Sequence, residues 1–95
     1  MIFTMTKEHL KGQYFNNVDC PYHRCIREKI KKGVEIFLGG TFIRFNDGDD
    51  HVILLTYEMI EYSMGFAKHS NGFECTAEPG FQFELPIPEE FLKGT

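Results

Sequence analysis

Residues 34–55, VEIFLGGTFIRFNDGDDHVILL, contain three runs of β-branched and aromatic residues separated by two turn signals. The runs at 34–38, 41–45 and 51–55 are typical of strands, because branched and aromatic side chains suit a pleated, half-buried surface. The first turn signal is a Gly-Gly pair and the second is the run Asn-Asp-Gly-Asp-Asp; both are typical of hairpins. This stretch predicts a three-stranded antiparallel meander, and the rest of the chain is interpreted around it.

The segments before the meander predict one short strand and two helices. Residues 2–4 favour a strand, and Thr6 is a suitable N-cap for a helical turn over 7–10. A longer helix is expected to begin at Asp19-Cys20-Pro21, because Asp caps an N-terminus and Pro is tolerated in the first turn. Gly33 is expected to end that helix, with Lys31 and Lys32 in its last turn, where they complement the helix dipole.

The helical repeat divides this expected helix into an apolar side and a charged side. A period of 3.6 residues brings Tyr22, Ile26 and Ile30 to one side, where they are expected to face the core. The opposite side carries the charged residues Arg24, Arg27, Glu28 and Lys31.

The segments after the meander predict another helix and a closing strand. Thr56 is expected to cap a helix over 57–69, and residues 81–85 alternate apolar and polar in the manner of a half-buried strand. The core-facing side of the helix is expected to carry Met59, Ile60 and Met64, with Ser63 or Phe66. Residues 73–76 are expected to form a short strand. The tail at 89–95 is expected to turn once and then to be mobile.

The order of these elements predicts an α+β fold made of one domain over residues 1–95. We expect a single, mostly antiparallel sheet of about four to six strands, with two helices packed on one face. The chain has 95 residues, of which 42% are hydrophobic, including 10 Phe and 4 Tyr. This content of large apolar side chains is sufficient for a core and is not typical of a disordered chain.

The cysteines and the N-terminal sequence indicate a cytoplasmic protein. Three cysteines, an odd number, disfavour a disulfide framework. The first residues lack a basic leader followed by a long apolar stretch. The longest strongly apolar run, Val52 to Leu55, is far shorter than the roughly 20 residues of a membrane span.

Charge is distributed unevenly along the chain, whose net charge is −4. Residues 1–32 carry seven basic and three acidic side chains, whereas residues 33–95 carry three basic and eleven acidic ones. Such polarity indicates two candidate contact surfaces, one basic and one acidic. The basic candidates are Arg24, Arg27 and Lys31, and the acidic candidates are Glu74, Glu84 and Glu89. Ordinary solvated surfaces explain the same residues.

Several features together resemble a group of small uncharacterised proteins encoded by bacteriophages and prophages. The matching features are Cys20-Pro21 at a helix start, the meander at 34–55, the helix after Thr56, and the segment 79–85 with its Phe-x-Phe. This sequence departs from the group after Cys20-Pro21, where Tyr, His and Arg stand in place of small residues. The resemblance implies the α+β fold and a phage accessory setting. The group has no established activity that the resemblance could assign to this chain.

The Cys and His residues suggest two kinds of chemistry, and neither has a complete signature. The spacing of Cys20, His23 and Cys25 argues against one tetrahedral zinc site, because Cys25 lies about 140° around the helix axis from Cys20 and points away from it. Cys20 at a helix start, with His23 as its base, is the candidate for thiol catalysis, and a buried packing role explains both residues equally. No metal or other cofactor is expected.

Other motifs are incomplete or absent. The acidic turn at 46–50 fails the calcium-loop template, because Val52 stands where Gly is needed when counting from Asp47. Phosphate-binding glycine loops and hydrolase motifs are absent from the sequence.

The sequence therefore leaves three functions open. The first is a non-enzymatic accessory protein, of phage or prophage type, that binds a host or phage protein. The alternatives are a nucleic-acid-binding module that uses the basic face of the first long helix, and a small thiol-dependent enzyme centred on Cys20 and His23. A homodimer is also possible, since open strand edges can pair between chains.

Overall fold

The computed structural model describes residues 1–11, 20–66 and 75–93, and it combines helices with antiparallel strands. The predicted α+β class is therefore confirmed. The strands are β1 (Ile2–Thr4), β2 (Glu35–Leu38), β3 (Phe42–Asn46), β4 (Asp50–Leu54) and β5 (Gln82–Glu84). The helices are α1 (Lys7–Leu10), α2 (Pro21–Arg27), α3 (Tyr57–Ser63) and the 3-10 helix η2 (Glu89–Phe91).

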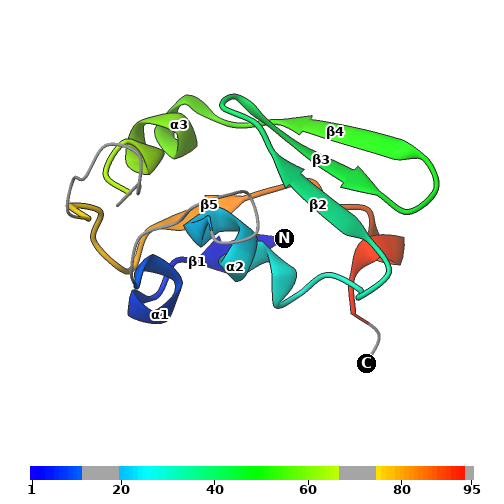
Figure 1. Ribbon diagram of the computed structural model, residues 1–95, viewed down its shortest axis with the longest axis horizontal. Helices are drawn as coiled ribbons and strands as arrows, with labels where there is room; N and C mark the ends of the chain where they lie inside the picture. The colour runs from blue at the N-terminus through cyan, green and yellow to red at the C-terminus, as the bar shows by residue number, and fades with distance from the viewer. Residues whose placement is uncertain (12–19, 67–74, 94–95) are drawn as a thin grey trace.

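The strands form two sheets, so the expected single sheet is wrong. The order β2-β3-β4 makes a three-stranded sheet, and β1 pairs with β5 in a separate two-stranded sheet (Figure 1). The two sheets do not join because α2 contacts both β1 and β2. Lys29, just after α2, donates to the Ile2 carbonyl at 3.3 Å, and the Cys25 thiol lies 3.5 Å from the Thr4 carbonyl. The outer edge of β1 is therefore closed by α2 and the turn after it.

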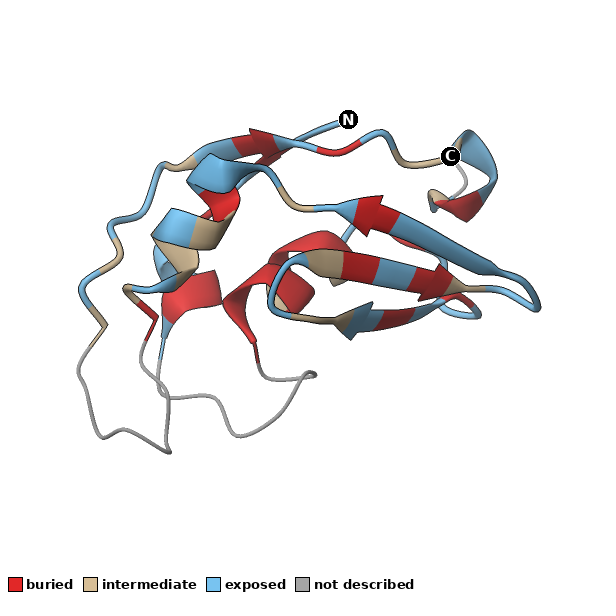
Figure 2. Ribbon diagram, turned by 90° about the horizontal axis from the view of Figure 1, so that it is seen from above, coloured by how far each residue is buried: buried red, intermediate tan, exposed pale blue. Residues whose placement is uncertain are grey.

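The predicted meander is confirmed, with strand bounds that differ from the expected ones by one residue. Arg44 in β3 is the partner of Phe37 in β2 and of Val52 in β4. Gly48 in the second turn has φ +122°, a conformation that side chains with a Cβ rarely adopt. Buried and exposed residues alternate along β3, as a strand with one covered face requires (Figure 2).

α1 is held at its start and tied to α2 through one buried histidine. The Thr6 hydroxyl accepts from the His9 amide, and the Thr6 amide donates to His9 Nδ1 at 3.0 Å, which confirms the predicted cap. Because Nδ1 is an acceptor, Nε2 carries the proton and donates to the Glu28 carboxylate at 2.7 Å. His9 therefore joins the N-terminal turn to the end of α2.

α2 ends earlier than predicted. Its N-cap is Cys20, while Asp19 lies outside the described residues, and its last residue is Arg27 rather than a residue next to Gly33. Lys31 and Lys32 therefore lie beyond the helix and do not complement its dipole. After Arg27 the chain tightens, because Lys29 and Ile30 donate to carbonyls only three residues back. Ile30 still reaches the core, as predicted, and so do Tyr22 and Ile26.

α3 begins at the predicted Thr56 cap and also ends early. Met59 is fully buried, as expected, but Met64 is 75% exposed, so its expected core position is wrong. The Gly65 carbonyl accepts bonds from the amides of Thr76 and Ala77. A Cβ at Gly65 would lie 2.9 Å from the Ala77 nitrogen, so the returning chain occupies the space that further helix would need.

The segments around β5 partly match the expectations. Residues 73 and 74 of the expected short strand lie outside the described residues, and residues 75 and 76 are not in a strand. The expected turn in the tail is η2. Its Phe91 is buried, and the Phe91 carbonyl accepts from the Lys31 amide at 2.8 Å. The tail is therefore packed against the fold as far as Lys93, and residues 94–95 lie outside the described part.

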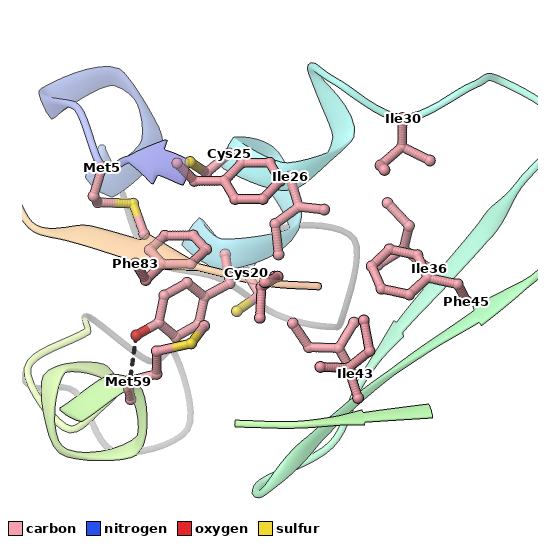
Figure 3. Close-up of a cluster of buried hydrophobic side chains, with 14 of the residues drawn as sticks. Met5, Cys20, Cys25, Ile26, Ile30, Ile36, Ile43, Phe45, Met59 and Phe83 are labelled. Atoms are coloured by element: carbon pink, nitrogen blue, oxygen red, sulfur yellow. Dashed lines mark hydrogen bonds between the residues drawn. The ribbon is translucent and has the colours of Figure 1, made fainter. Parts of the chain in front are cut away.

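The core lies between α2, the β1–β5 pair and the inner face of the three-stranded sheet. Figure 3 shows side chains from all of these elements meeting, among them Cys20, Ile26, Phe45 and Phe83. The Tyr22 hydroxyl donates to the Met59 carbonyl at 2.7 Å and so attaches α3 to α2. Within the described residues, no helix is long and apolar enough to cross a membrane.

Candidate functional site

The two arginines of the predicted basic surface bind backbone carbonyls. Arg24 donates to the carbonyls of His9 and Lys11, at 3.1 and 2.6 Å, where α1 ends. Arg27 donates to the Val34 carbonyl at 2.6 Å and also to the carbonyls of Ile30 and Lys31. Each guanidinium therefore completes the hydrogen bonds of its own chain, and this structural role already accounts for both residues.

The structure places one predicted basic residue and one predicted acidic residue in the same hollow. Lys31 and Glu89 line a surface hollow of about 560 Å³, together with Glu28, Lys29 and Lys93. They meet because the tail runs beside the segment after α2, where the Lys93 backbone amide donates to the Lys29 carbonyl. The charge polarity seen along the sequence is therefore mixed in space at this point.

The remaining acidic candidates do not join that hollow. Glu84 is exposed on β5, with its side chain on the opposite face to the buried Phe83. Glu74 lies outside the described residues. The expected acidic surface of Glu74, Glu84 and Glu89 thus has two members that the structure describes, and only Glu89 lies beside the basic residues.

Cys20 and His23, the candidates for thiol catalysis, are both buried. Cys20 is 9% exposed and His23 is 7% exposed. In Figure 3, Cys20 lies among the apolar side chains of the core. Burial raises the pKa of the neighbouring Cys25 thiol to about 11, which disfavours its reactive thiolate form. A substrate would have to open the core to reach Cys20, so the geometry favours packing over catalysis.

The described residues also offer no metal centre. Among them, no group of three or more His, Cys, Asp or Glu side chains converges in a way that could hold an ion. Cys20 and Cys25 are both buried, and Cys75 is half-buried on the segment that crosses α3.

A different surface stands out, on the outer face of the three-stranded sheet. We call this surface the outer face and define it by Phe37, Phe42, Arg44, Val52 and Leu54. Val52 is 56% exposed and Leu54 is 75% exposed, although both are strongly apolar. Large apolar side chains gathered on one exposed face are typical of a contact surface.

The side chains of the outer face are arranged by contacts with one another. The rings of Phe37 and Phe42 stack with centroids 6.2 Å apart, and the Arg44 guanidinium carbon lies 4.9 Å from the Phe37 ring centroid. Arg44 Nε also lies 3.9 Å from an Asp50 oxygen. These contacts hold a planar cation over an aromatic ring, and such preorganisation lowers the entropy lost when a partner binds.

A hollow continues the outer face toward α2. It has a volume of about 350 Å³ and is lined by Phe37 and Arg44 of the outer face, together with Glu35, Arg27 and His23. The outer face is therefore not a flat strip, because an apolar area with one cation leads into a recess at the edge of β2 that has both charged and apolar lining residues.

Sequence reasoning did not single out the outer face, although the sequence contains a signal for it. A half-buried strand alternates apolar and polar residues, but β2, β3 and β4 carry apolar residues on both faces. Phe37, Val52 and Leu54 are the apolar residues that face outward, where a half-buried strand would carry polar ones. Comparisons with known proteins add nothing to this geometry, since no protein-family model, curated protein or solved structure matches the chain.

Proposed function

We propose that this protein is a non-enzymatic binding module that contacts another protein through the outer face. The observation that supports the proposal is the exposed set of Phe37, Val52 and Leu54, with the half-buried Phe42, around Arg44. Aromatic residues and Arg are enriched where protein interfaces bind most strongly, while Val and Leu supply apolar area. Burying that area on association contributes roughly 25 cal/mol per Å², before the costs of binding are subtracted.

The charges around the outer face favour a protein over a nucleic acid as its partner. Glu35, Asp47, Asp49 and Asp50 lie at the same end of the face, next to the turn between β3 and β4, because Glu35 is the partner of Asn46 and Asn46 is the partner of Asp50. Arg44 is the single cation on the face itself. Because phosphates bind to clustered cations, this group of carboxylates opposes nucleic-acid binding at that end of the face.

The resemblance to small phage and prophage proteins supports a setting for this function. In that setting the protein is an accessory factor and its partner is a protein of the bacterial host or of the phage. The two arginines expected to carry nucleic-acid binding already hold backbone carbonyls, which weakens the nucleic-acid alternative.

The experiment is a pull-down of tagged protein from bacterial lysate, with and without nuclease, using two variants of equal design. Leu54→Asp places a charge on the outer face, and Met64→Asp places the same charge on α3. These residues form a matched pair, because both are 75% exposed. We expect Leu54→Asp to lose a stoichiometric protein partner that Met64→Asp retains and that survives nuclease.

Each other outcome contradicts the proposal in a specific way. Recovery that disappears with nuclease would establish the nucleic-acid alternative. A partner retained by Leu54→Asp would place the contact surface elsewhere. If no partner is found and Cys20 of the native protein reacts quickly with an alkylating reagent near neutral pH, the thiol-dependent enzyme becomes the better account.

A further inference from the structure

β4 presents unpaired backbone groups along its outer edge. The Leu55 amide donates to the Thr41 carbonyl, and β4 pairs with β3 in antiparallel register with Ile53 opposite Ile43. In such a ladder, alternate residues direct their N–H and C=O groups toward the partner strand. Residues 51, 53 and 55 therefore bond to β3, and the groups of Asp50, Val52 and Leu54 point away from it.

The outer edge of β4 has no partner within the described part of the chain. The described strands place β3 on one side of β4 and nothing on the other, and Figure 1 shows β4 at the margin of the fold. Its residues other than Ile53 are exposed. An edge of this kind is a template for another strand.

Other strand edges in the molecule are closed or guarded. The outer edge of β1 is covered by Cys25 and Lys29, and Arg27 donates to the Val34 carbonyl where β2 begins. β5 is 3 residues long, ends at Glu84 and is followed by two prolines nearby. β4 is 5 residues long, contains neither Lys nor Pro, and keeps an unbroken register with β3. Apart from the charge of Asp50 at its first position, it therefore lacks the features that normally prevent edge pairing.

We propose that β4 binds an extended segment of the partner protein as a fourth strand of the sheet. This inference rests on the proposed function and specifies how the outer face is used. Backbone hydrogen bonds to Asp50, Val52 and Leu54 fix the segment, and its alternate side chains extend the outer face beside Val52 and Leu54. Those side chains are apolar, because the side chains next to them are apolar.

Charge specifies one end of the bound segment. Asp50, the first residue of β4, is the partner of Asn46 across the hairpin; the Asn46 side-chain amide donates to it at 2.6 Å, and Arg44 Nε lies 3.9 Å away. Asp47 and Asp49 lie in the same exposed turn. A Lys or Arg on the incoming segment, opposite Asp50, complements this charge. The partner segment is therefore extended, with apolar residues at alternate positions and a basic residue at the end next to the turn.

A second copy of the chain is a poorer occupant of the same edge. Symmetric antiparallel pairing centred on Val52 places Leu54 of each copy opposite Asp50 of the other. Pairing centred on Asp50 places like charges opposite each other, which is destabilising. Pairing centred on Leu54 leaves Asp50 and Val52 beyond the overlap of the two strands, and pairing centred on His51 places Asp50 opposite Val52. Pairing centred on Ile53 matches Val52 with Leu54, but it leaves Asp50 opposite Thr56, beyond β4 of the other copy and without a cation. A strand from another protein, with a basic residue opposite Asp50, therefore fits the edge of β4 better than β4 of a second copy does.

The alternation of backbone groups provides a selective variant. Val52→Pro removes the outward N–H at the centre of the edge, while the bonds to β3 are made by residues 51 and 53. Val52→Thr keeps that N–H and a β-branched side chain, so it is the matched control. Both variants are first checked for an unchanged circular dichroism spectrum.

The experiment selects peptides from a random decapeptide library displayed on messenger RNA against the full chain. Peptides enriched by the protein are expected to alternate apolar and polar residues, with Lys or Arg at one end. Val52→Pro is expected to weaken them by at least roughly tenfold, and Val52→Thr to change them little. Amide hydrogen exchange of the unmodified protein gives a readout that does not depend on any variant. Saturating peptide is expected to slow exchange at Val52 and Leu54 more than at Ile53.

Several results would overturn the inference, and they separate it from the proposed function. Selected peptides that bind Val52→Pro normally, show no basic preference, or leave exchange at Val52 unchanged would exclude strand addition. If such peptides nevertheless lose binding to Leu54→Asp, the outer face remains the contact surface. If the library yields no binder and the protein is a dimer that Val52→Pro converts to a monomer, the occupant is a second copy. If neither a peptide nor a lysate protein binds, the proposed function itself fails.

Discussion

Arg27 lies where the chain leaves α2, and its guanidinium donates to the carbonyls of Ile30, Lys31 and Val34. A lysine at this position has no planar fork that reaches several acceptors at once. We therefore expect Arg27→Lys to lower the free energy of unfolding by roughly 1–2 kcal/mol, since at least one carbonyl loses its partner. Urea unfolding followed by circular dichroism measures the change.

Lys31→Arg is the matched control for Arg27→Lys, because it makes the reverse exchange, without a change of charge, at an exposed residue just beyond α2. It is expected to change stability by less than about 0.5 kcal/mol. Equal unfolding midpoints for Arg27→Lys and the unmodified protein would contradict the structural role assigned to Arg27. They would return this arginine to the set of candidate contact residues.

The buried thiol of Cys25 makes stability depend on alkaline pH. Burial, reinforced by the nearby Glu28 carboxylate, raises the pKa of Cys25 to about 11, whereas the thiol of an unfolded chain ionises with a pKa near 8.5. The unfolded state therefore loses its proton first as pH rises. Stability should fall between about pH 9 and pH 11, because over that range the folded state retains a proton that the unfolded state has lost.

Urea midpoints measured at a series of pH values across that range test this expectation. Burial also raises the pKa of Tyr62 to about 12 and raises the pKa of Tyr22 still further, so both tyrosines lower stability from about pH 10 upward. Cys25→Ala therefore removes the decline between about pH 9 and pH 10, makes the decline above pH 10 less steep, and leaves the contribution of the tyrosines. If Cys25→Ala shows the same decline above pH 9 as the unmodified protein, the thiol is not its source.

At the scale of elements, the turn between β2 and β3 determines how the outer face is arranged. A Cβ on Gly39 would lie 2.3 Å from the Phe42 ring, whereas a Cβ on Gly40 meets nothing within 4 Å. Gly39→Ala is therefore expected to displace the Phe42 ring from Phe37 and to weaken partner binding severalfold. Its effect on stability should be small, since the ring is at the surface and free to move outward.

Gly40→Ala is the control for this element, because it adds the same methyl group to the same turn without a clash. Binding of the selected peptides is measured for both variants by isothermal titration calorimetry. Equal affinities for Gly39→Ala and Gly40→Ala would show that the stacking of Phe37 and Phe42 does not contribute to recognition.

Local patterns predicted most of the elements, and contacts between distant residues account for the differences. The meander and the Thr6 and Thr56 caps depend on neighbouring residues, so the sequence indicates them directly. At the end of α2, Arg27 donates to the Val34 carbonyl, and just after α3 the Gly65 carbonyl accepts from the amides of Thr76 and Ala77. No pattern within either helix records these contacts.

The candidate site was harder to predict than the elements for the same reason. The apolar residues Val52 and Leu54 were visible in the sequence, but an apolar strand residue is usually interpreted as core. Their exposure follows from the position of the core, which lies on the other face of the sheet with Ile36, Ile43, Phe45 and Ile53, so that even Phe37 of β2 is exposed on the outer face. No sequence pattern indicated the structural role of Arg24 and Arg27, which donate to carbonyls of their own backbone.

At the scale of the whole molecule, the tail closes the fold at the end that carries the three-stranded sheet. Phe91 is 4% exposed, and its ring centroid lies 6.0 Å from that of Phe45. The rings of Phe91 and His51 of β4 meet in a T-shaped arrangement, with their centroids 5.7 Å apart. An isolated bridge between Ile30 and Leu92 continues the same contact. The inner face of the sheet is thus covered by residues from both ends of the sequence, and the packing behind β4 depends on them.

Phe91→Ala is therefore expected to destabilise the whole protein by about 3–5 kcal/mol, as is usual when a buried ring is removed. Domains of this kind have a total stability of only about 5–15 kcal/mol, so the variant should unfold at much lower urea concentration. Glu90→Ala, which changes an exposed residue of the same turn, should be nearly neutral. Amide exchange across β4 gives the decisive readout, because loss of Phe91 removes the support beneath His51 and should raise exchange at His51 and Ile53 together with global unfolding. If exchange instead rises in η2 and the rest of the chain keeps its stability, the tail is an attached segment and the sheet that carries the outer face is supported without it.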